Sequence, residues 1–385
     1  MGQGNNQEAF FALLRAGLWP ESEKQVSVDG DVEWEQIYRL ASEQSVLGLV
    51  LAGIDCLPVD QRPPKVMLLQ WIGEIQILEQ QNKWMNVFVG ELVSGMRNEG
   101  IYTLLVKGQG IAQCYEKPLW RSCGDVDFFL SDENYEKAKA YLSPLATDVN
   151  KEYVREMHLG MIIDSQVVEL HGRLYSGISS RIDRELDDVY EDTFIGGNVR
   201  IWVNGETQVF LLGVENDVFY VFTHILQHFY KEGVGLRQFC DLCRLLWTFR
   251  EKLDVKKLET RLKRAKLTMA WKAFAAFAVE YLGMPVDAMP LFDENDSFDK
   301  LSINKNKKLY RKAELIKDFV LDVGNFGYNR DSSYFAKYPY VIRKACSLGR
   351  RCGDIIRHAR IFPADAMRFF PRIVINGVQS AVRGE

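Results

Sequence analysis

Hydrophobic residues recur at helical spacing through the first hundred positions of the chain. Phe10, Leu13 and Leu14 share one helical face, and the longest periodic stretch runs from Pro64 to Asn98 before Gly100. Apolar side chains three and four residues apart line one side of a helix, and glycine commonly follows a helix end. Residues 1–100 are therefore expected to form an N-terminal helical region.

The pattern changes to strand-like alternation after residue 100. The stretch 104–130, LLVKGQGIAQCYEKPLWRSCGDVDFFL, predicts a strand, a short helix and a second strand. A helix over 132–145 and strands near 153–161, 161–171 and 199–203 predict an α+β core with a small mixed sheet over residues 101–205. After Glu206 the chain is expected to be helical, with residues 206–284 closing a cleft and 285–385 forming a C-terminal helical region.

The second of these strands carries two carboxylates on one face. Strand side chains alternate, so Asp125, Asp127 and Phe129 project from one side while Val126 and Phe128 project from the other. Neighbouring carboxylates beside an apolar run are costly without a cation between them. Oxygen ligands at this spacing suit Mg²⁺ or Mn²⁺. The alternative interpretation is a solvent-facing strand end that holds no metal.

A third carboxylate comes from the segment 161–171, in which Glu169 and His171 share a face with Val167. If this strand lies beside the first, Glu169 joins Asp125 and Asp127. Three acidic ligands are what a two-metal phosphoryl or nucleotidyl transfer site requires, because two ions must be bridged and the attacking oxygen activated.

The order Lys107-Gly108, Arg121, Gly124-Asp125-Val126-Asp127 and Glu169-Leu170-His171 resembles the uncharacterised nucleotidyltransferases of the DNA polymerase beta-like superfamily, over about residues 100–250. The resemblance implies a polymerase beta-like core flanked by helices. It also implies that a glycine-containing turn positions a nucleoside triphosphate, while carboxylates bind Mg²⁺ or Mn²⁺. The implied catalytic and metal-binding residues are Asp125, Asp127 and Glu169. The implied nucleotide-binding residues are Lys107, Gly108, Gln109, Arg121, His171 and Arg237.

The implied reaction transfers a nucleoside monophosphate from a magnesium-bound nucleoside triphosphate to a hydroxyl-bearing acceptor. Many active superfamily members carry Gly-Ser at the turn, whereas this chain has Gly108-Gln109 after Lys107. A lysine charge and a glutamine amide thus replace a hydroxyl near phosphate. Two alternatives remain: an inactive nucleotide-binding or regulatory protein, and a transferase accessory to surface-polysaccharide biosynthesis.

Two polar pairs follow on predicted helices. His224 and His228 lie four residues apart, so that one can line the cleft or both can pack in the core; a zinc site would need a further ligand. Arg237 and Asp241 have the same spacing, and Arg237 either pairs with Asp241 or reaches phosphate. Arg121 is the stronger phosphate candidate, because it directly precedes the acidic strand and its guanidinium can form two parallel hydrogen bonds.

Composition narrows the function classes. The 385-residue chain has a net charge of −4 and a pI near 5.9, which excludes a global nucleic-acid-binding surface. Seven scattered cysteines argue against a disulfide framework, and the closest pair, Cys240 and Cys243, is expected to pack inside a helix. The N-terminus lacks signal-peptide features and no apolar run reaches about 18 residues, so we expect a cytoplasmic protein without a transmembrane segment.

The C-terminal end is basic, with nine Lys and Arg against three acidic residues in 338–385. Its arginines alternate with apolar residues, which predicts amphipathic helices. Such helices either bind an anionic lipid, glycan or nucleic acid, or pack against the acidic remainder of the chain.

Overall fold

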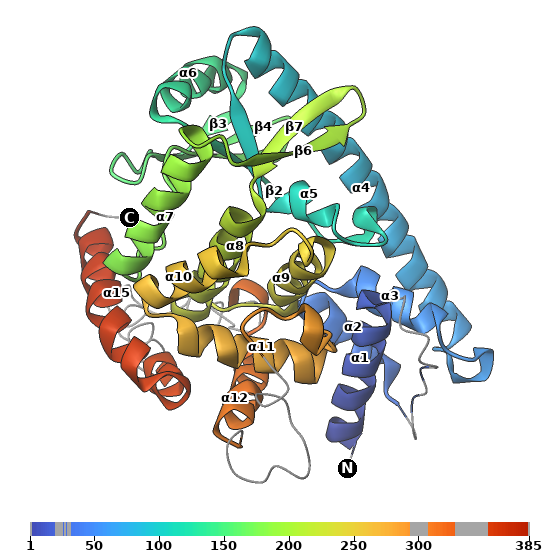
Figure 1. Cartoon of the computed structure of the whole chain (residues 1–385). Helices are drawn as coiled ribbons and strands as arrows, with labels where there is room; N and C mark the ends of the chain where they lie inside the picture. Colours follow the sequence, from blue (N-terminus) through green and yellow to red (C-terminus); the bar gives the residue numbers. More distant parts are fainter. Residues whose placement is uncertain are drawn as a thin grey trace.

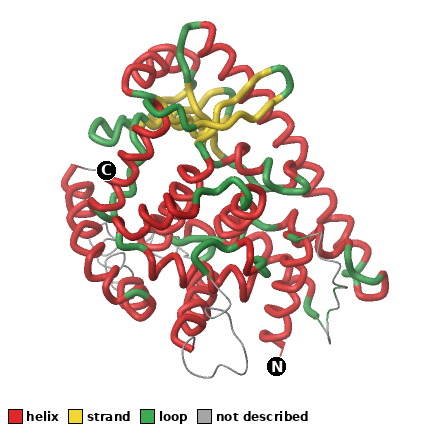
Figure 2. The backbone as a smooth tube through the Cα atoms, in the orientation of Figure 1, coloured by secondary structure: helices red, strands yellow, loops and turns green. Residues whose placement is uncertain are grey.

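The computed structural model of the chain describes residues 2–19, 26, 28, 32–292, 307–327 and 353–383. It is an α+β protein in which a mixed seven-stranded sheet is flanked by helices (Figures 1 and 2), as the sequence predicts. The strand order is β3-β4-β5-β2-β1-β7-β6. The strands are β1 Thr103–Val106, β2 Asp125–Leu130, β3 Asp148–Val149, β4 His158–Ile163, β5 Gln166–His171, β6 Val199–Asn204 and β7 Thr207–Leu212.

Helices precede, interrupt and follow the sheet. The N-terminal helices are α1 Gly2–Leu18, α2 Trp34–Glu43, α3 Leu47–Asp55 and α4 Lys65–Asn98. The helices between and after the strands are α5 Gly108–Ala112, α6 Asp132–Leu142, α7 Ser180–Phe194, α8 Val214–Lys231, α9 Leu236–Phe249, α10 Val255–Ala265 and α11 Thr268–Leu282. The C-terminal helices are α12 Lys307–Val323, a helix over 353–361 and α15 Pro363–Arg383, and short 3-10 turns complete the list at 59–61, 118–120, 143–145, 286–288 and 325–327.

The sheet separates two hydrophobic clusters. Because side chains alternate along β2, Val126 and Phe128 pack in a cluster with α4 and α6. Phe129 packs in a larger cluster with the helices on the other side of the sheet. Figure 1 shows α6 at the top of the molecule, α4 running from the top down the right side, and α8 to α11 below the sheet. Because the two faces of β2 pack against different layers, the carboxylates on the Phe129 face point toward α8 and α9.

Helix α4 holds the segment between β1 and β2 in place. It starts after Pro63-Pro64 and ends before Gly100, whose φ is +71°, so its 34 residues span about 51 Å. Asn82 on this helix donates hydrogen bonds to the carbonyls of Leu119 (2.8 Å) and Arg121 (2.9 Å). These bonds satisfy backbone carbonyls of the loop that leads into β2, so they fix where that strand begins.

The segment after Glu206 differs from its helical expectation. Residues 207–212 form β7, which pairs with β6 in a hairpin and with β1 in parallel. Gly205 adopts φ +60° in the two-residue turn between β6 and β7. Asn204 pairs with Thr207, so the turn residues are Gly205 and Glu206, and glycine at the first position of a two-residue hairpin turn adopts positive φ without steric cost. The sheet thus extends beyond residue 205, and the helical region begins at Val214.

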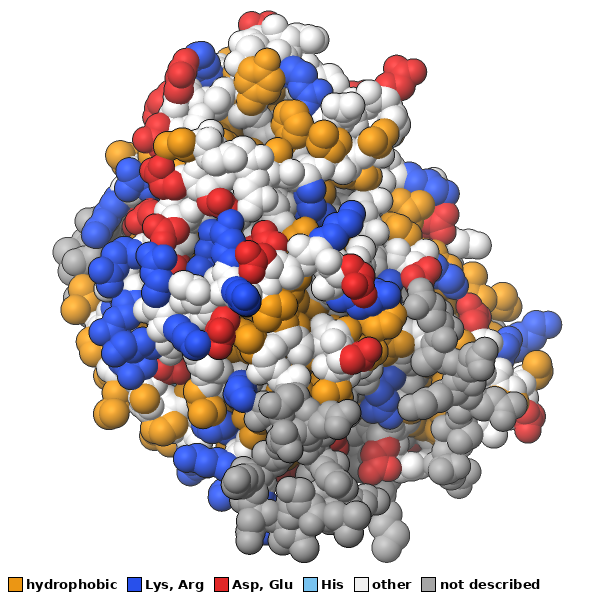
Figure 3. Space-filling view, in the orientation of Figure 1, with side chains coloured by type: hydrophobic (Ala, Val, Ile, Leu, Met, Phe, Trp, Pro, Cys, Tyr) orange, Lys and Arg blue, Asp and Glu red, His pale blue; other side chains and the backbone are white. Residues whose placement is uncertain are grey.

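Arginines in the described part of the C-terminal region pair with carboxylates of the chain. Arg372 lies 2.8 Å from Asp183 of α7, Arg368 lies 3.2 Å from Asp365, and Arg357 pairs with Asp322. These contacts favour packing against the rest of the chain. Figure 3 shows Lys and Arg side chains mixed with acidic ones over α10 and α15 at the left.

The first part of the basic C-terminal end, residues 338–352, and its last two residues lie outside the described residues. Among the helices that the structure describes, none has the length and apolar character needed to cross a bilayer.

Candidate active site

The three predicted carboxylates lie on adjacent strands. Strands β2 and β5 are parallel, and their register places Asp127 opposite Glu169 and Asp125 opposite Val167. Asp127 is 1% exposed, whereas Asp125 and Glu169 are partly exposed. Because residues paired across parallel strands project from the same face, Asp125, Asp127 and Glu169 form one acidic row.

Lys107 reaches this row from the end of β1. Its Nζ lies 2.9 Å from Asp127 Oδ1, and its backbone adopts φ +58°, a region that side chains other than glycine rarely occupy. Backbone strain of this kind costs about 1–3 kcal/mol and clusters at functional sites. Gly108 follows at φ +42°, where an added Cβ would lie 3.4 Å from Cys123 Sγ. The turn therefore presses closely against the start of β2.

Charge around Lys107 determines its protonation. Burial alone would lower the pKa of Lys107, but the carboxylates of Asp127, Asp125 and Glu169 raise it above its usual value. The side chain is therefore a fixed positive charge within the acidic row.

His171 bridges two members of the row. Its Nε2 lies 2.8 Å from Asp127 Oδ1 and 3.4 Å from Glu169 Oε2, and His158 Nε2 lies 3.2 Å from the same Glu169 oxygen. Hydrogen bonds from His158 and His171 hold the pKa of Glu169 far below its usual range. Burial alone would lower the pKa of His171, but its bonds to Asp127 and Glu169 raise it. His171 thus contacts the acidic row and orients it.

The ionised form of Asp125 is destabilised by the neighbouring carboxylate. The negative charge of Asp127, followed by burial, raises the pKa of Asp125, while Lys107 partly offsets this effect. A divalent cation between the two carboxylates would relieve the repulsion, and carboxylate oxygens are the ligands that Mg²⁺ and Mn²⁺ prefer. The donor set of Asp125, Asp127 and Glu169 therefore fits the expected metal.

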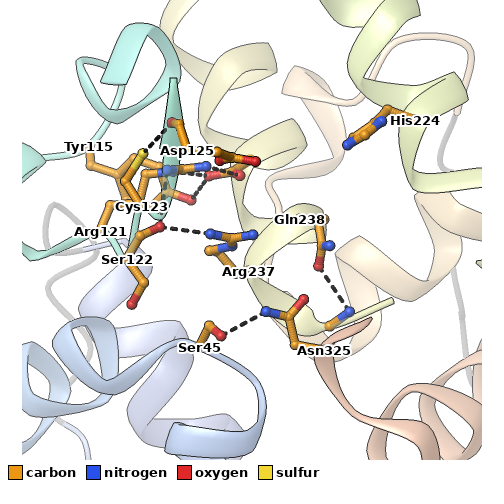
Figure 4. Close-up of polar contacts among 12 residues, drawn as sticks. Ser45, Tyr115, Arg121, Ser122, Cys123, Asp125, His224, Arg237, Gln238 and Asn325 are labelled. Atoms are coloured by element: carbon orange, nitrogen blue, oxygen red, sulfur yellow. Dashed lines mark hydrogen bonds and ion pairs between the residues drawn. The ribbon is translucent and has the colours of Figure 1, made fainter. Parts of the chain in front are cut away.

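A cleft of about 40 Å³ lies in front of Asp125 and Asp127, between the sheet and helices α8 and α9. Lys107, Gly108, Arg121 and Arg237 also line it, so four of the six predicted nucleotide-binding residues meet here. The other lining residues are Ile111, Val221, His224, Ile225, Gln238 and Asp241. Figure 4 shows Arg237 and Gln238 on one wall and Asp125 with Arg121 on the other.

Arg121 pairs with Asp241. Its Nε and Nη2 donate to the two Asp241 oxygens at 2.8 and 2.7 Å, and Tyr115 Oη donates to Asp241 at 2.7 Å. Asp241 thus pairs with Arg121 and not with Arg237, whose Nη1 donates to the Ser122 carbonyl at 2.9 Å (Figure 4). The buried pair ties α9 to the loop before β2, which gives Arg121 a positioning role.

Gln109 lies elsewhere. Its side chain is 2% exposed, and its amide donates to Asn82 Oδ1 at 2.7 Å on the side of α4, away from the cleft. The short helix α5 thus turns the Gln109 side chain toward α4, and its predicted role in nucleotide binding stays a prediction. His171 also lies outside the cleft lining and contacts the carboxylates instead.

The histidine pair on α8 is divided between cleft and core. His224 lines the cleft, and its Nε2 lies 3.0 Å from His228 Nε2. Burial, followed by the charge of Lys107, holds the pKa of His224 well below its usual value, so the imidazole is neutral. Cys240 and Cys243 are both buried on α9, as the helical pattern predicts.

Sequence reasoning missed His158 and the role of Asp241. The sequence prediction placed the break between the two strands at Met161, whereas the structure has β4 over His158–Ile163, β5 over Gln166–His171 and a two-residue turn between them, in which Asp164 and Ser165 adopt positive φ. Counting outward from that turn places His158 opposite His171. The Arg121 to Asp241 pair had no local signal, because its partners are 120 residues apart.

An acidic row on adjacent strands, a glycine-containing turn after the first strand and a cleft lined by cations define a nucleotidyltransferase-type protein. The model of the uncharacterised nucleotidyltransferase family matches residues 30–283, and the chain belongs to this family. Searches of curated proteins and of solved structures found no match. Membership supports the enzyme class and a nucleotide substrate expected from the sequence.

Proposed function

We propose that the protein is a cytoplasmic enzyme that transfers a nucleoside monophosphate from a magnesium-bound nucleoside triphosphate to a hydroxyl group. The observation that carries this proposal is the pairing of Asp127 with Glu169 across parallel strands, with Asp125 two residues away on the same face. Asp125, Asp127 and Glu169 would hold the ion. Bound Mg²⁺ or Mn²⁺ supplies charge neutralisation on the phosphate oxygens and orients the attacking oxygen.

Two cations at the cleft suit the phosphates. Lys107 projects from the strained turn, and Arg237 stands at the first turn of α9 beside Ser122. Fixed positive groups aimed at developing phosphate charge contribute several kcal/mol in a site that excludes water. The Arg121 guanidinium donates two hydrogen bonds to Asp241 of α9, so it would hold α9, and with it Arg237, in position.

The size of the cleft sets a requirement. Ligand pockets typically measure about 300–1,000 Å³, and the cleft beside Asp125 measures about 40 Å³. Entry of a nucleoside triphosphate therefore requires the groups that line the cleft to move apart, whether by side-chain rotation or by movement of α8 and α9. Closure afterwards would exclude water from the phosphates.

The test is pyrophosphate release from each Mg²⁺-nucleoside triphosphate in the presence of hydroxyl-bearing acceptors, with wild-type protein and Asp127→Asn. The variant should lose at least about a thousandfold in turnover, since loss of a metal-binding carboxylate removes about 4 kcal/mol of transition-state stabilisation. Turnover retained by Asp127→Asn would remove the assignment.

The same assay distinguishes the enzyme from an inactive nucleotide-binding or regulatory protein. That alternative is favoured by the turn, where the residue after Gly108 is a buried glutamine and offers no hydroxyl to phosphate. A regulatory protein with this fold would bind Mg²⁺-nucleotide and release no pyrophosphate. Circular dichroism of Asp127→Asn, unchanged from wild type, would show that lost turnover reflects chemistry and not unfolding.

A further inference from the structure

A second group of metal-ligand side chains stands beside the acidic row. His158, Glu169 and His171 offer one ligand atom each, and these three atoms lie within 4.8 Å of one another. Within the described ranges, no other set of three or more His, Cys, Asp or Glu side chains meets this criterion. Two of the three ligand atoms are imidazole nitrogens, which distinguishes this group from the carboxylates of Asp125 and Asp127.

The hairpin of β4 and β5 builds this group. His158 and His171 are direct partners across the antiparallel strands, and Glu169 is two residues from His171 on the same face. The two imidazole rings are stacked, with centroids 4.7 Å apart and planes 14° from parallel. Tyr153 stacks on the outer side of His158 at 5.8 Å. The rings are therefore held side by side, with both Nε2 atoms directed at one carboxylate oxygen.

The distances approach those of a tetrahedral site. Metal bonds of about 2.0–2.1 Å place tetrahedral ligands about 3.3–3.4 Å apart. Glu169 Oε2 lies 3.2 Å from His158 Nε2 and 3.4 Å from His171 Nε2. The third separation is at most 4.8 Å, and His158 is 29% exposed at its side chain, so that a modest rotation of this ring can shorten it.

We propose that His158, Glu169 and His171 bind a divalent transition-metal ion, with Zn²⁺ as the best match to two imidazoles and one carboxylate. Imidazole ligands favour Zn²⁺ and similar ions over Mg²⁺, and two histidines with one glutamate leave a fourth position open for water or substrate. Because His171 Nε2 also contacts Asp127 Oδ1 at 2.8 Å, metal binding at this nitrogen would replace that hydrogen bond. This site goes beyond the proposed nucleotidyl transfer, although the two share Glu169.

The experiment measures metal binding without nucleotide. Zn²⁺ is titrated calorimetrically into metal-free protein, and Co²⁺ is added as a spectroscopic probe whose visible bands report tetrahedral coordination. Wild-type protein should bind one equivalent of each. His158→Gln and His171→Gln should each lose at least about a hundredfold in affinity, because even the hydrogen-bond partners of metal ligands are worth 10–100-fold.

His228→Gln is the matched control. His224 and His228 also approach through their Nε2 atoms, at 3.0 Å, so this pair is the nearest competing site for Zn²⁺. His228→Gln should bind Zn²⁺ and Co²⁺ as wild type does. Loss of binding in His228→Gln with retention in His158→Gln would overturn the proposal, as would equal affinity in all variants or no Zn²⁺ binding by wild type.

Nucleotide binding separates this proposal from the proposed function. His158→Gln should still bind a Mg²⁺-nucleotide analogue, because Asp125, Asp127 and Glu169 are intact. Because His158 is partly exposed, its variant should have the wild-type circular dichroism spectrum in the presence of chelator. Loss of Zn²⁺ binding alone then supports the transition-metal site, whatever the outcome of the turnover assay.

Discussion

The two faces of strands β2 and β5 differ in the chemistry and the burial of their side chains. On one face Val126, Phe128 and Leu170 are completely or almost completely buried in a cluster with α4 and α6. On the other face Asp125 and Asp127 share an acidic row with Glu169, bounded by Lys107 and His171. Alternation along a strand thus places stability and chemistry one residue apart. The apolar face should tolerate no loss of volume, while the acidic face should tolerate loss of charge at the expense of function.

Removal of a large side chain from the apolar face should have the greatest effect on stability. Phe128 is fully buried, and Phe128→Ala should reduce the free energy of unfolding by about 3–5 kcal/mol, because it loses apolar burial and leaves a cavity. Guanidinium denaturation measures this change. Val167→Ala, at a β5 position that is 40% exposed, should change stability by only about 0.5 kcal/mol.

The buried ion pair behind the acidic face comes next. Asp241→Asn leaves the Arg121 guanidinium, 6% exposed, without its counter-charge, and should reduce the free energy of unfolding by about 3 kcal/mol. The control is Lys137→Ala, which breaks a solvent-exposed pair with Glu133 on α6 and should leave the free energy of unfolding almost unchanged. Equal costs for the two variants would show that the Arg121 pair does not hold α9.

Asp125→Asn should increase the free energy of unfolding, whereas the two variants above should decrease it. Asp127 raises the pKa of Asp125, so ionised Asp125 disfavours the folded state, and a neutral amide should raise the free energy of unfolding by about 1 kcal/mol. The gain should be absent below about pH 4 and grow as pH rises through the folded-state pKa. Denaturation at several pH values measures it, and a stability loss above pH 7 would contradict the electrostatic account.

His171→Gln should give the smallest change in stability. Its bonds to Asp127 and Glu169 raise its pKa, so its charged form stabilises the fold fully below the unfolded value of about 6.5. This contribution is lost as pH rises through the folded-state pKa. The stability difference between wild type and His171→Gln should therefore shrink between pH 6 and pH 9. A difference independent of pH over this range would show that His171 acts through packing.

The sequence predicted those parts of the site that depend on local pattern. The period of two along β2 placed Asp125 and Asp127 on one face, the alternation in 161–171 supplied Glu169 as a third carboxylate, and the resemblance to nucleotidyltransferases supplied Lys107. The structure confirms that β5 lies beside β2. It also places Lys107 Nζ 2.9 Å from Asp127 Oδ1, a contact that the sequence did not predict. The other features could be predicted because alternation along a strand and the order of residues in a motif are local properties of the sequence.

Other features depend on contacts between distant segments. The direction of the Gln109 side chain is decided by Asn82 on α4, and the partner of Arg121 by a helix 120 residues further along. No local spacing encodes such contacts. By contrast, β7 and His158 lie beside tight two-residue turns, Gly205-Glu206 and Asp164-Ser165, whose short length fixes the register of the flanking strands.

The most direct test of the acidic row is a calorimetric titration of each non-hydrolysable Mg²⁺-nucleoside triphosphate into wild-type protein and the Asp125→Asn, Asp127→Asn double variant. Wild type should bind one nucleotide, and the double variant should lose at least about a hundredfold in affinity, because both carboxylate ligands of the ion become neutral amides. Equal binding by the two proteins, or no binding by wild type, would contradict the assignment of this face as the nucleotide site.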